Sequence, residues 1–156
     1  MVRCAVVLTA LALLAACALP DPWAEIPAID YPSDDVEGVV EWVEWWLVYL
    51  RDEYLYGEPE HWASPAESYA TQAGDCEDHV ILALYLLDRD FGISGRLVLG
   101  QSLYAGAPTD SLHAWLRVGS MDYDVVEGAA LPVEYYRDVY SLSWPEVRSL
   151  LSSHRQ

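Results

Sequence analysis

The chain has 156 residues, enough for one domain, and 53% of them are hydrophobic while 21% are charged, a balance typical of globular proteins. Asp and Glu number 25 against 8 cations, all of them Arg, so the formal net charge is −17. A chain this acidic repels phosphate backbones, which excludes nucleic acid as a partner.

The first seventeen residues predict an export signal that ends at a lipid attachment site. Arg3 gives a positive start, and the apolar run from Ala5 to Ala16 is shorter than the roughly 20 residues of a spanning helix. Leu14-Ala15-Ala16-Cys17 resembles the lipobox of bacterial lipoproteins, in which cleavage before the Cys leaves it carrying lipid. We therefore expect a signal peptide at 1–16 and a lipid-anchored protein of the bacterial cell envelope. The alternative is an ordinary secretory signal in which Cys17 is incidental.

The cysteine count after export indicates that Cys76 has a function. Cys4 leaves with the signal and Cys17 carries lipid, so Cys76 is the one remaining thiol. A lone thiol in an oxidising compartment is liable to mixed disulfides and overoxidation, so keeping it indicates a function.

Residues 17–35 predict a tether, and residues 36–156 predict the folded domain. The tether carries acids and no sustained hydrophobic period. Trp23 and Ile29 are its candidates for docking on the domain. Its prolines are Pro20, Pro22, Pro27 and Pro32.

Hydrophobic spacing predicts three helices in the first half of the domain. The first covers 36–56, with Ser33, Asp34 or Asp35 as N-cap. A capping box begins at Ser64 and predicts a short helix to about Gln72. The third runs from Cys76 to about Asp90, with Asp75 and Asp78 forming a second box.

Alternating residues then predict a small antiparallel sheet. Its strands are expected at 96–103, 112–118 and 123–126, and the tail at 132–152 is expected to form two short helices. Helices followed by strands predict an α+β domain in which helices pack on the sheet.

Cys76 opens its helix, where free backbone N–H groups and the helix dipole favour a thiolate. The adjacent acids oppose this, so an imidazolium from elsewhere is needed. Among four His, only His113 lies mid-strand between apolar neighbours. A carboxylate on the next strand would orient its ring, and the candidates are Asp122, Asp124 and Glu127.

Three blocks between Ser64 and Gly128 resemble the bacterial transglutaminase-like superfamily. They are Gly74-Asp75-Cys76-Glu77-Asp78-His79, His113-Ala114-Trp115 and Tyr123-Asp124-Val125-Val126-Glu127-Gly128. The resemblance implies a papain-like fold, with Cys76 as nucleophile and His113 as its base. In that family an aromatic residue precedes the acid by four positions. Tyr123 in that register implies Glu127 as the third member, and the family's usual Asp leaves Asp124 as the alternative.

The same residues allow other assignments. Asp75, Asp78 and His79 share one helical side, which invites a metal site. Capping already accounts for both aspartates and no second ligand cluster is evident, so we expect no metal and no cofactor. The backbone N–H of Cys76 is the first expected oxyanion donor, and Gln72 and Tyr69 are the candidates for a second. Trp45 and Trp62 are candidates to line a substrate cleft.

The sequence therefore predicts an exported, lipid-anchored acyl-transfer enzyme. Its substrate is a peptide or protein of the cell envelope, and hydrolysis is favoured over cross-linking because water is abundant there. The alternative is a module of the same fold that lacks catalysis and binds a peptide or partner lipoprotein.

Overall fold

The computed structural model describes residues 23, 25–104, 106–131 and 133–153. The predicted signal peptide and the predicted lipid site at Cys17 lie outside these residues. None of the helices described is both long and apolar enough to cross a membrane.

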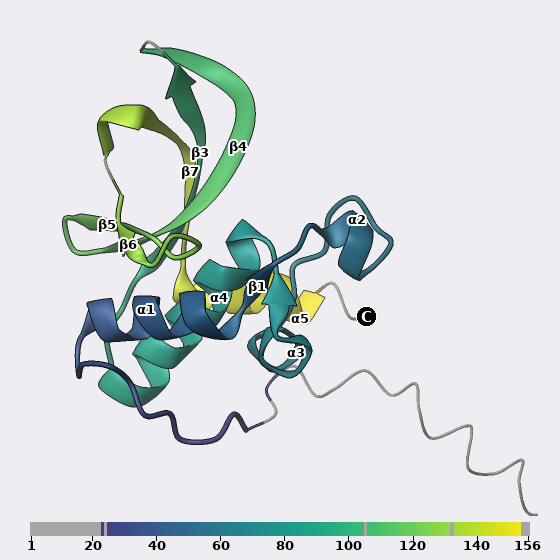
Figure 1. The fold of residues 1–156 in the computed structure, drawn as a ribbon, viewed down its shortest axis with the longest axis vertical. Coiled ribbons are helices and arrows are strands. Elements are labelled where there is room, and N and C mark those ends of the chain that lie inside the picture. The colour runs from purple at the N-terminus through teal and green to yellow at the C-terminus, as the bar shows by residue number, and fades with distance from the viewer. Residues whose placement is uncertain (1–22, 24, 105, 132, 154–156) are drawn as a thin grey trace, which may run out of the picture.

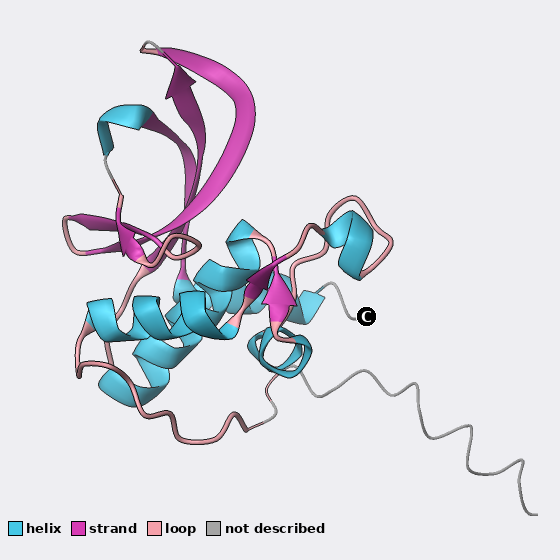
Figure 2. Ribbon diagram, viewed as in Figure 1, coloured by secondary structure: helices cyan, strands magenta, loops and turns pink. Residues whose placement is uncertain are grey.

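Helices lead and strands follow along the chain, which confirms the α+β prediction. Figures 1 and 2 show the helices gathered at one end, with the β3–β4 arm rising beyond them. The helices are α1 (Val36–Trp46), α2 (Asp52–Leu55), α3 (Pro65–Thr71), α4 (Cys76–Leu86), η1 (Leu87–Phe91), η2 (Val133–Tyr135) and α5 (Trp144–Ser153). The strands are β1 (Val48–Tyr49), β2 (Ala73–Gly74), β3 (Arg96–Tyr104), β4 (Ala107–Val118), β5 (Met121–Asp124), β6 (Ala129–Ala130) and β7 (Tyr136–Ser143).

Helix α4 is the centre of the core. Its residues from Glu77 to Leu84 are buried, and it packs against α1, α3 and β4. A helix that is buried around its circumference needs neighbours on several sides, and the other elements supply them. Its first turn nevertheless carries acids, so polar groups are forced into the interior beside Cys76.

The predicted first helix is too long. The predicted N-cap is confirmed, since Asp35 accepts a hydrogen bond from the backbone N–H of Gly38. The helix ends at Trp46 because Leu47 turns extended, and Val48–Tyr49 then pair in parallel with Ala73–Gly74 as β1 and β2. This pairing places residues 48–49 directly beside the start of α4.

The second helix begins as predicted. Ser64 and Glu67 form the reciprocal capping box, and Pro65 occupies the first turn of α3. The predicted box at α4 is wrong in one half, because the Asp75 side chain makes no capping bond although Asp75 is the N-cap residue. The carboxylate of Asp78 instead accepts a hydrogen bond from the backbone N–H of Ala63 at 2.8 Å.

The five-stranded sheet is antiparallel, in the order β6-β5-β4-β3-β7. The three predicted strands are present as β3, β4 and β5. Alternation along β4 holds as expected: Ala114 and Leu116 face the helices, while Trp115 joins a second cluster with Val98 and Tyr136 on the other face.

The predicted pair of helices in the tail is wrong in its first half. Residues 136–143 form strand β7, which pairs with β3 and buries Leu142. Only Tyr140-Ser141-Leu142-Ser143 alternates apolar and polar residues, and the remaining edge of β3 offers the whole segment a partner. Only α5 of the predicted helices forms, after the short η2 turn.

The second half of the predicted tether lies on the domain. Ile26 is 4% exposed and belongs to the main core, and the Arg89 guanidinium donates to its carbonyl at 2.8 Å. Trp23 and Ile29, the two predicted docking residues, both pack against this core, and the Trp23 ring lies 6.2 Å from the ring of Trp144. The docked part of the predicted tether therefore begins no later than Trp23.

Replacing the cap of α3 tests its contribution to stability. We expect Ser64→Ala to lower the free energy of unfolding by about 1–2 kcal/mol, because the backbone N–H groups of the first turn lose their acceptor. Urea denaturation measures the change. Ser120→Ala, in an exposed turn, is the control and should change it by less than about 0.5 kcal/mol. Equal effects of the two changes would contradict this role.

Candidate functional site

Cys76 is half-buried at the first position of α4, beside strand β4. It is a free thiol, and its sulfur lies 3.4 Å from Oε2 of Glu77. The backbone N–H of Ala114 lies near enough to this sulfur to lower the pKa of the thiol. Because Ala114 directly follows His113, the fold brings the thiol to the strand that carries the predicted base.

His113 is held by Asp124. Its Nε2 lies 2.8 Å from Oδ2 of Asp124, which is buried at the end of β5. The other carboxylate oxygen accepts from the backbone N–H groups of Val126 at 3.1 Å and Glu127 at 3.3 Å. With Nε2 engaged, Nδ1 is the ring nitrogen left to face a second group such as a thiol.

The register of the sheet explains why Asp124, and not Glu127, meets the histidine. Leu116 lies opposite Tyr123, so Asp124 comes next to Trp115, on the face of β4 that also carries His113. Glu127 lies beyond the end of β5 and reaches the pair only through its backbone. The partner that the family register favours, Glu127, is therefore replaced by the alternative. The third candidate, Asp122, is bound to Arg117 at 2.6 Å.

The electrostatics around Cys76 favour the neutral thiol. Burial raises the pKa of Cys76, and the neighbouring charge of Glu77 raises it further, while the N–H of Ala114 acts in the opposite direction. The opposition by adjacent acids expected from the sequence is therefore present. A thiolate at this position needs an imidazolium beside it.

Carboxylates that are distant in sequence gather next to the thiol. Burial raises the pKa values of Asp52, Asp75, Glu77 and Asp78, because their charged forms lose solvation. Asp52 and Asp78 are 2% and 0% exposed. The oxygens Asp52 Oδ1, Asp75 Oδ1 and Asp78 Oδ2 have no hydrogen-bond partner among the residues described.

These three aspartates are also the group that could hold a cation. One oxygen from each lies within 4.8 Å of the others, and carboxylate oxygens suit hard divalent ions. This group contains Asp52 in place of His79, which the sequence suggests as a ligand. His79 instead directs its Nδ1 at the carbonyl of Asp75, 2.7 Å away. Asp52 was missed because it lies 23 positions before Asp75, with no local pattern to link the two.

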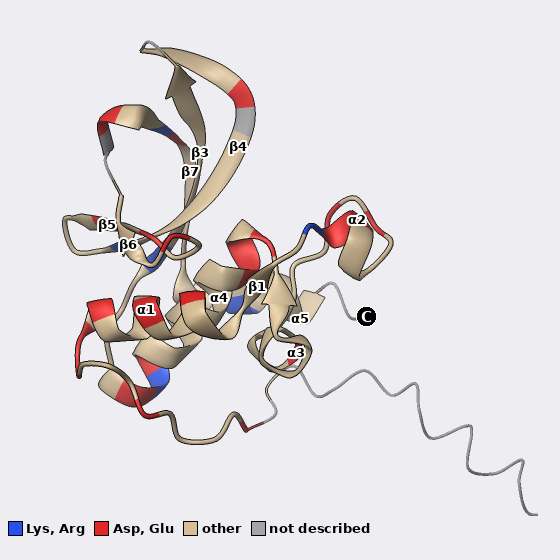
Figure 3. Ribbon diagram, in the orientation of Figure 1, with Lys and Arg blue, Asp and Glu red and all other residues tan. Residues whose placement is uncertain are grey.

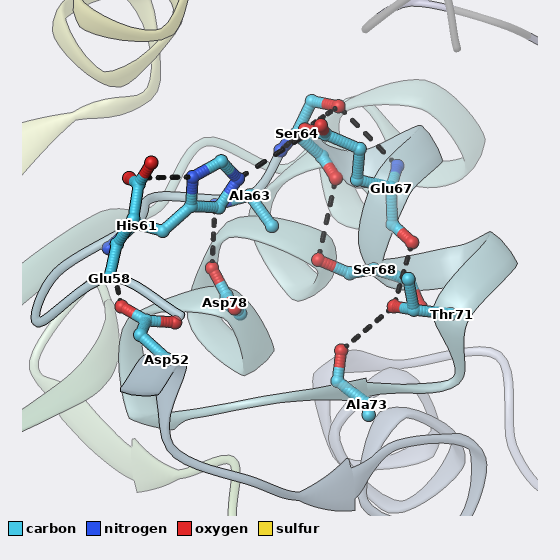
Figure 4. Close-up of polar contacts among 10 residues, drawn as sticks. All are labelled: Asp52, Glu58, His61, Ala63, Ser64, Glu67, Ser68, Thr71, Ala73 and Asp78. Atoms are coloured by element: carbon cyan, nitrogen blue, oxygen red, sulfur yellow. Dashed lines mark hydrogen bonds and ion pairs between the residues drawn. The ribbon is translucent and has the colours of Figure 1, made fainter. Parts of the chain in front are cut away.

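A polar network beneath the site fixes the loop that follows α2 (Figure 4). Asp52 accepts from the backbone N–H of His61, and Asp78 accepts from that of Ala63. The ring of His61 lies between carboxylates of Glu58 and Glu67, at 3.9 and 4.0 Å. The buried acids thus serve as anchors for backbone groups as well as neighbours of Cys76.

The remaining predicted residues lie in different settings. Trp45 is 74% exposed, while Trp62 packs against the core and donates to Glu60 at 2.9 Å. The predicted oxyanion donor Tyr69 stacks on Trp46, with ring centroids 4.9 Å apart. The other, Gln72, is exposed in a left-handed conformation.

Sequence reasoning missed Tyr49 of β1. Tyr49 pairs with Gly74, two residues before Cys76, and its pKa is raised first by burial and then by the charge of Cys76. The misjudged length of the first helix hid this placement.

Comparison with known proteins adds no assignment. No protein-family model matches the chain, and no curated protein matches it. The resemblance to the transglutaminase-like superfamily therefore depends on the three quoted blocks, and the function drawn from it is a proposal.

The buried acids predict an unusual dependence of stability on pH. Burial raises the pKa of Glu77 from 4.5 to about 10, so between these values the folded state holds a proton that the unfolded state has released. The free energy of unfolding should fall as pH rises across this window, by at most about 1.4 kcal/mol per pH unit for this group. Urea denaturation at pH 6, 7 and 8 measures the slope.

Glu77→Gln removes this titrating group and should flatten the slope. Glu53→Gln changes an exposed acid and should leave it unaltered. The assignment would be contradicted if the two variants had the same slope as the unmodified chain.

Proposed function

We propose that the protein is a cysteine-dependent acyl-transfer enzyme, a peptidase or amidase, with a transglutaminase-like core. The observation that carries the proposal is the 2.8 Å contact between His113 Nε2 and Asp124 Oδ2. The residue after His113, Ala114, lies close enough to Cys76 to lower the pKa of the thiol. The order of nucleophile on a helix, then histidine and acid on adjacent strands, supports the papain-like assignment.

In the proposed reaction, His113 takes the thiol proton through its free Nδ1 as the sulfur attacks a carboxamide or peptide carbonyl. The C–N bond then breaks, and the imidazolium returns the proton to the departing amine. Water attacks the remaining thioester, giving a carboxylic acid and the free thiol. Asp124 holds the ring orientation and offsets the positive charge of the imidazolium. The backbone N–H of Cys76 is the natural first donor to the oxyanion.

A second candidate function is a binding module without catalysis. The observation in its favour is the raised pKa of Cys76, whose thiol lies against the carboxyl group of Glu77. In such a module the thiol is a packing group and the His113–Asp124 pair is a structural contact.

The rate of alkylation by iodoacetamide separates the two functions. An enzyme with a thiolate held by His113 should alkylate rapidly below pH 8, and His113→Ala should slow this by roughly tenfold or more. A buried structural thiol should react slowly, at a rate that His113→Ala leaves unchanged.

The same assay assigns the acid. Asp124→Asn should slow alkylation because the ring loses its carboxylate partner, whereas Glu127→Gln, the matched control three residues beyond β5, should not. Equal loss from both changes, or no loss from either, would reject Asp124 as the orienting residue.

The proposed location is the bacterial cell envelope, with lipid on Cys17 as the anchor. Support comes from the pattern of residues 1–17 alone. In a bacterial host, labelled palmitate should enter the chain, and Cys17→Ser should abolish labelling while Cys76→Ser leaves it intact. Equal labelling of the Cys17→Ser variant would reject the anchor.

A further inference from the structure

Three aromatic rings meet on the face of the sheet that points away from the helices. The imidazole of His113 lies 5.6 Å from the ring of Tyr136, centroid to centroid, and the ring of Trp115 lies 5.6 Å from the same tyrosine. The rings of His113 and Trp115 are 6.5 Å apart, so each ring is within contact range of the other two. Tyr136 begins β7, the strand that the sequence did not predict. The candidate base therefore has an aromatic neighbour from outside the three family blocks.

Strand β3 lies between the strands that carry His113 and Tyr136, and a glycine in it makes room for the contact. Gly100 of β3 lies opposite His113 on β4, and Ser102 lies opposite Tyr136 on β7. A Cβ at Gly100 would overlap the six-membered ring of Trp115. The indole therefore occupies the space above β3 that another side chain would fill, and it reaches across to Tyr136.

An ion pair fixes the position of β7 close to these rings. Arg117 of β4 donates to Asp138 of β7 at 2.6 Å, and Asp138 is two residues from Tyr136. Side chains two residues apart on a strand lie on the same face, so Tyr136 and Asp138 share the face that carries His113 and Arg117. The tyrosine ring is thus held beside the imidazole by a contact that spans three strands.

The surroundings of the three rings carry little charge. β3 has no charged residue from Leu97 to Tyr104, and Figure 3 shows most of this strand in tan. Trp115 is 1% exposed and packs with Val98 and Leu131, which are also buried. A hydrogen bond beside such an apolar cluster is stronger than one in water, because water competes less for its donor and acceptor.

Tyr136 is neutral beside the His113–Asp124 pair. Its pKa is raised from 10, first by burial and then by the charges of Asp124 and Glu127. A neutral ring adds no charge that would compete with Asp124 for the imidazole. An imidazolium that forms during a reaction is in addition stabilised by an aromatic ring within about 6 Å.

We propose that Tyr136 is a positioning residue of the proposed reaction. This inference rests on the proposed function and adds a residue to its site. Together with Trp115, the tyrosine ring covers the outer side of the His113–Asp124 hydrogen bond, excludes water from it and restricts rotation of the imidazole. Nε2 then stays with Asp124, and Nδ1 stays available to the thiol of Cys76.

The first test follows the proton of this hydrogen bond by NMR in the full chain. The Nε2 proton of His113 should give a downfield signal that exchanges slowly with water. Tyr136→Ala opens the outer side and should speed this exchange about tenfold or more, whereas Tyr136→Phe keeps the ring and should change it by less than about twofold. Tyr140→Ala, at an exposed tyrosine of the same strand, is the control and should leave the exchange unaltered.

The rate of alkylation by iodoacetamide at pH 7 is the second test. Tyr136→Ala should slow it about threefold to tenfold, because the imidazole then spends part of its time turned away from the thiol. Tyr136→Phe should restore the rate of the unmodified chain. Circular dichroism checks folding, and Tyr136→Thr, a residue suited to a strand, takes the place of the alanine variant with the same expectation if that variant does not fold.

Two results would overturn the proposal. One is exchange and alkylation that Tyr136→Ala leaves unchanged, and the other is an equal loss in Tyr136→Ala and Tyr136→Phe.

These outcomes are distinguishable from failure of the proposed function. If His113→Ala leaves alkylation unchanged, the catalytic assignment falls, and the role of Tyr136 in a reaction falls with it. If His113→Ala slows alkylation while Tyr136→Ala does not, the enzyme stands and Tyr136 has no part in positioning its base.

Discussion

The register between β4 and β5 is the constraint on which the site depends. Leu116 opposite Tyr123 places Asp124 two residues along from His113 on one face of the sheet, where a 2.8 Å hydrogen bond forms. A shift of one residue would turn Asp124 to the other face and break the pair. The same short pairing ends at Leu116, so Cys76 lies beside the buried backbone of Ala114 where a further strand would otherwise pair. One register therefore both orients the imidazole and leaves room for the thiol next to β4.

Elements that are specified by neighbouring residues can be predicted from the sequence. The Ser64–Glu67 capping box depends on residues that are close in sequence, and so does the alternation of Ala114, Trp115 and Leu116. The structure confirms both predictions. Elements and clusters whose partners are distant in sequence could not be predicted in this way. Strand β7 depends on the free edge of β3, and the gathering of Asp52 with Asp78 depends on how the loop after α2 folds back.

The choice between Asp124 and Glu127 as the partner of His113 depends on a small structural difference. Family spacing after Tyr123 points to Glu127, but β5 ends at Asp124, and the chain then turns so that Val126 and Glu127 donate their N–H groups to the Asp124 carboxylate. Only the strand's end decides between the two acids. The buried carboxylates beside Cys76 carry a stability cost that solvated acids would not, and such costs concentrate at functional sites.

The docking of Trp23 and Ile26 on the core would limit the reach of the domain if the proposed lipid were attached at Cys17. Five residues separate Cys17 from Trp23, and a chain of that length spans about 20 Å when fully extended. Held on so short a radius, the thiol would meet only chains that pass close to the bilayer surface. Proximity to the lipid would then limit which substrates reach the thiol.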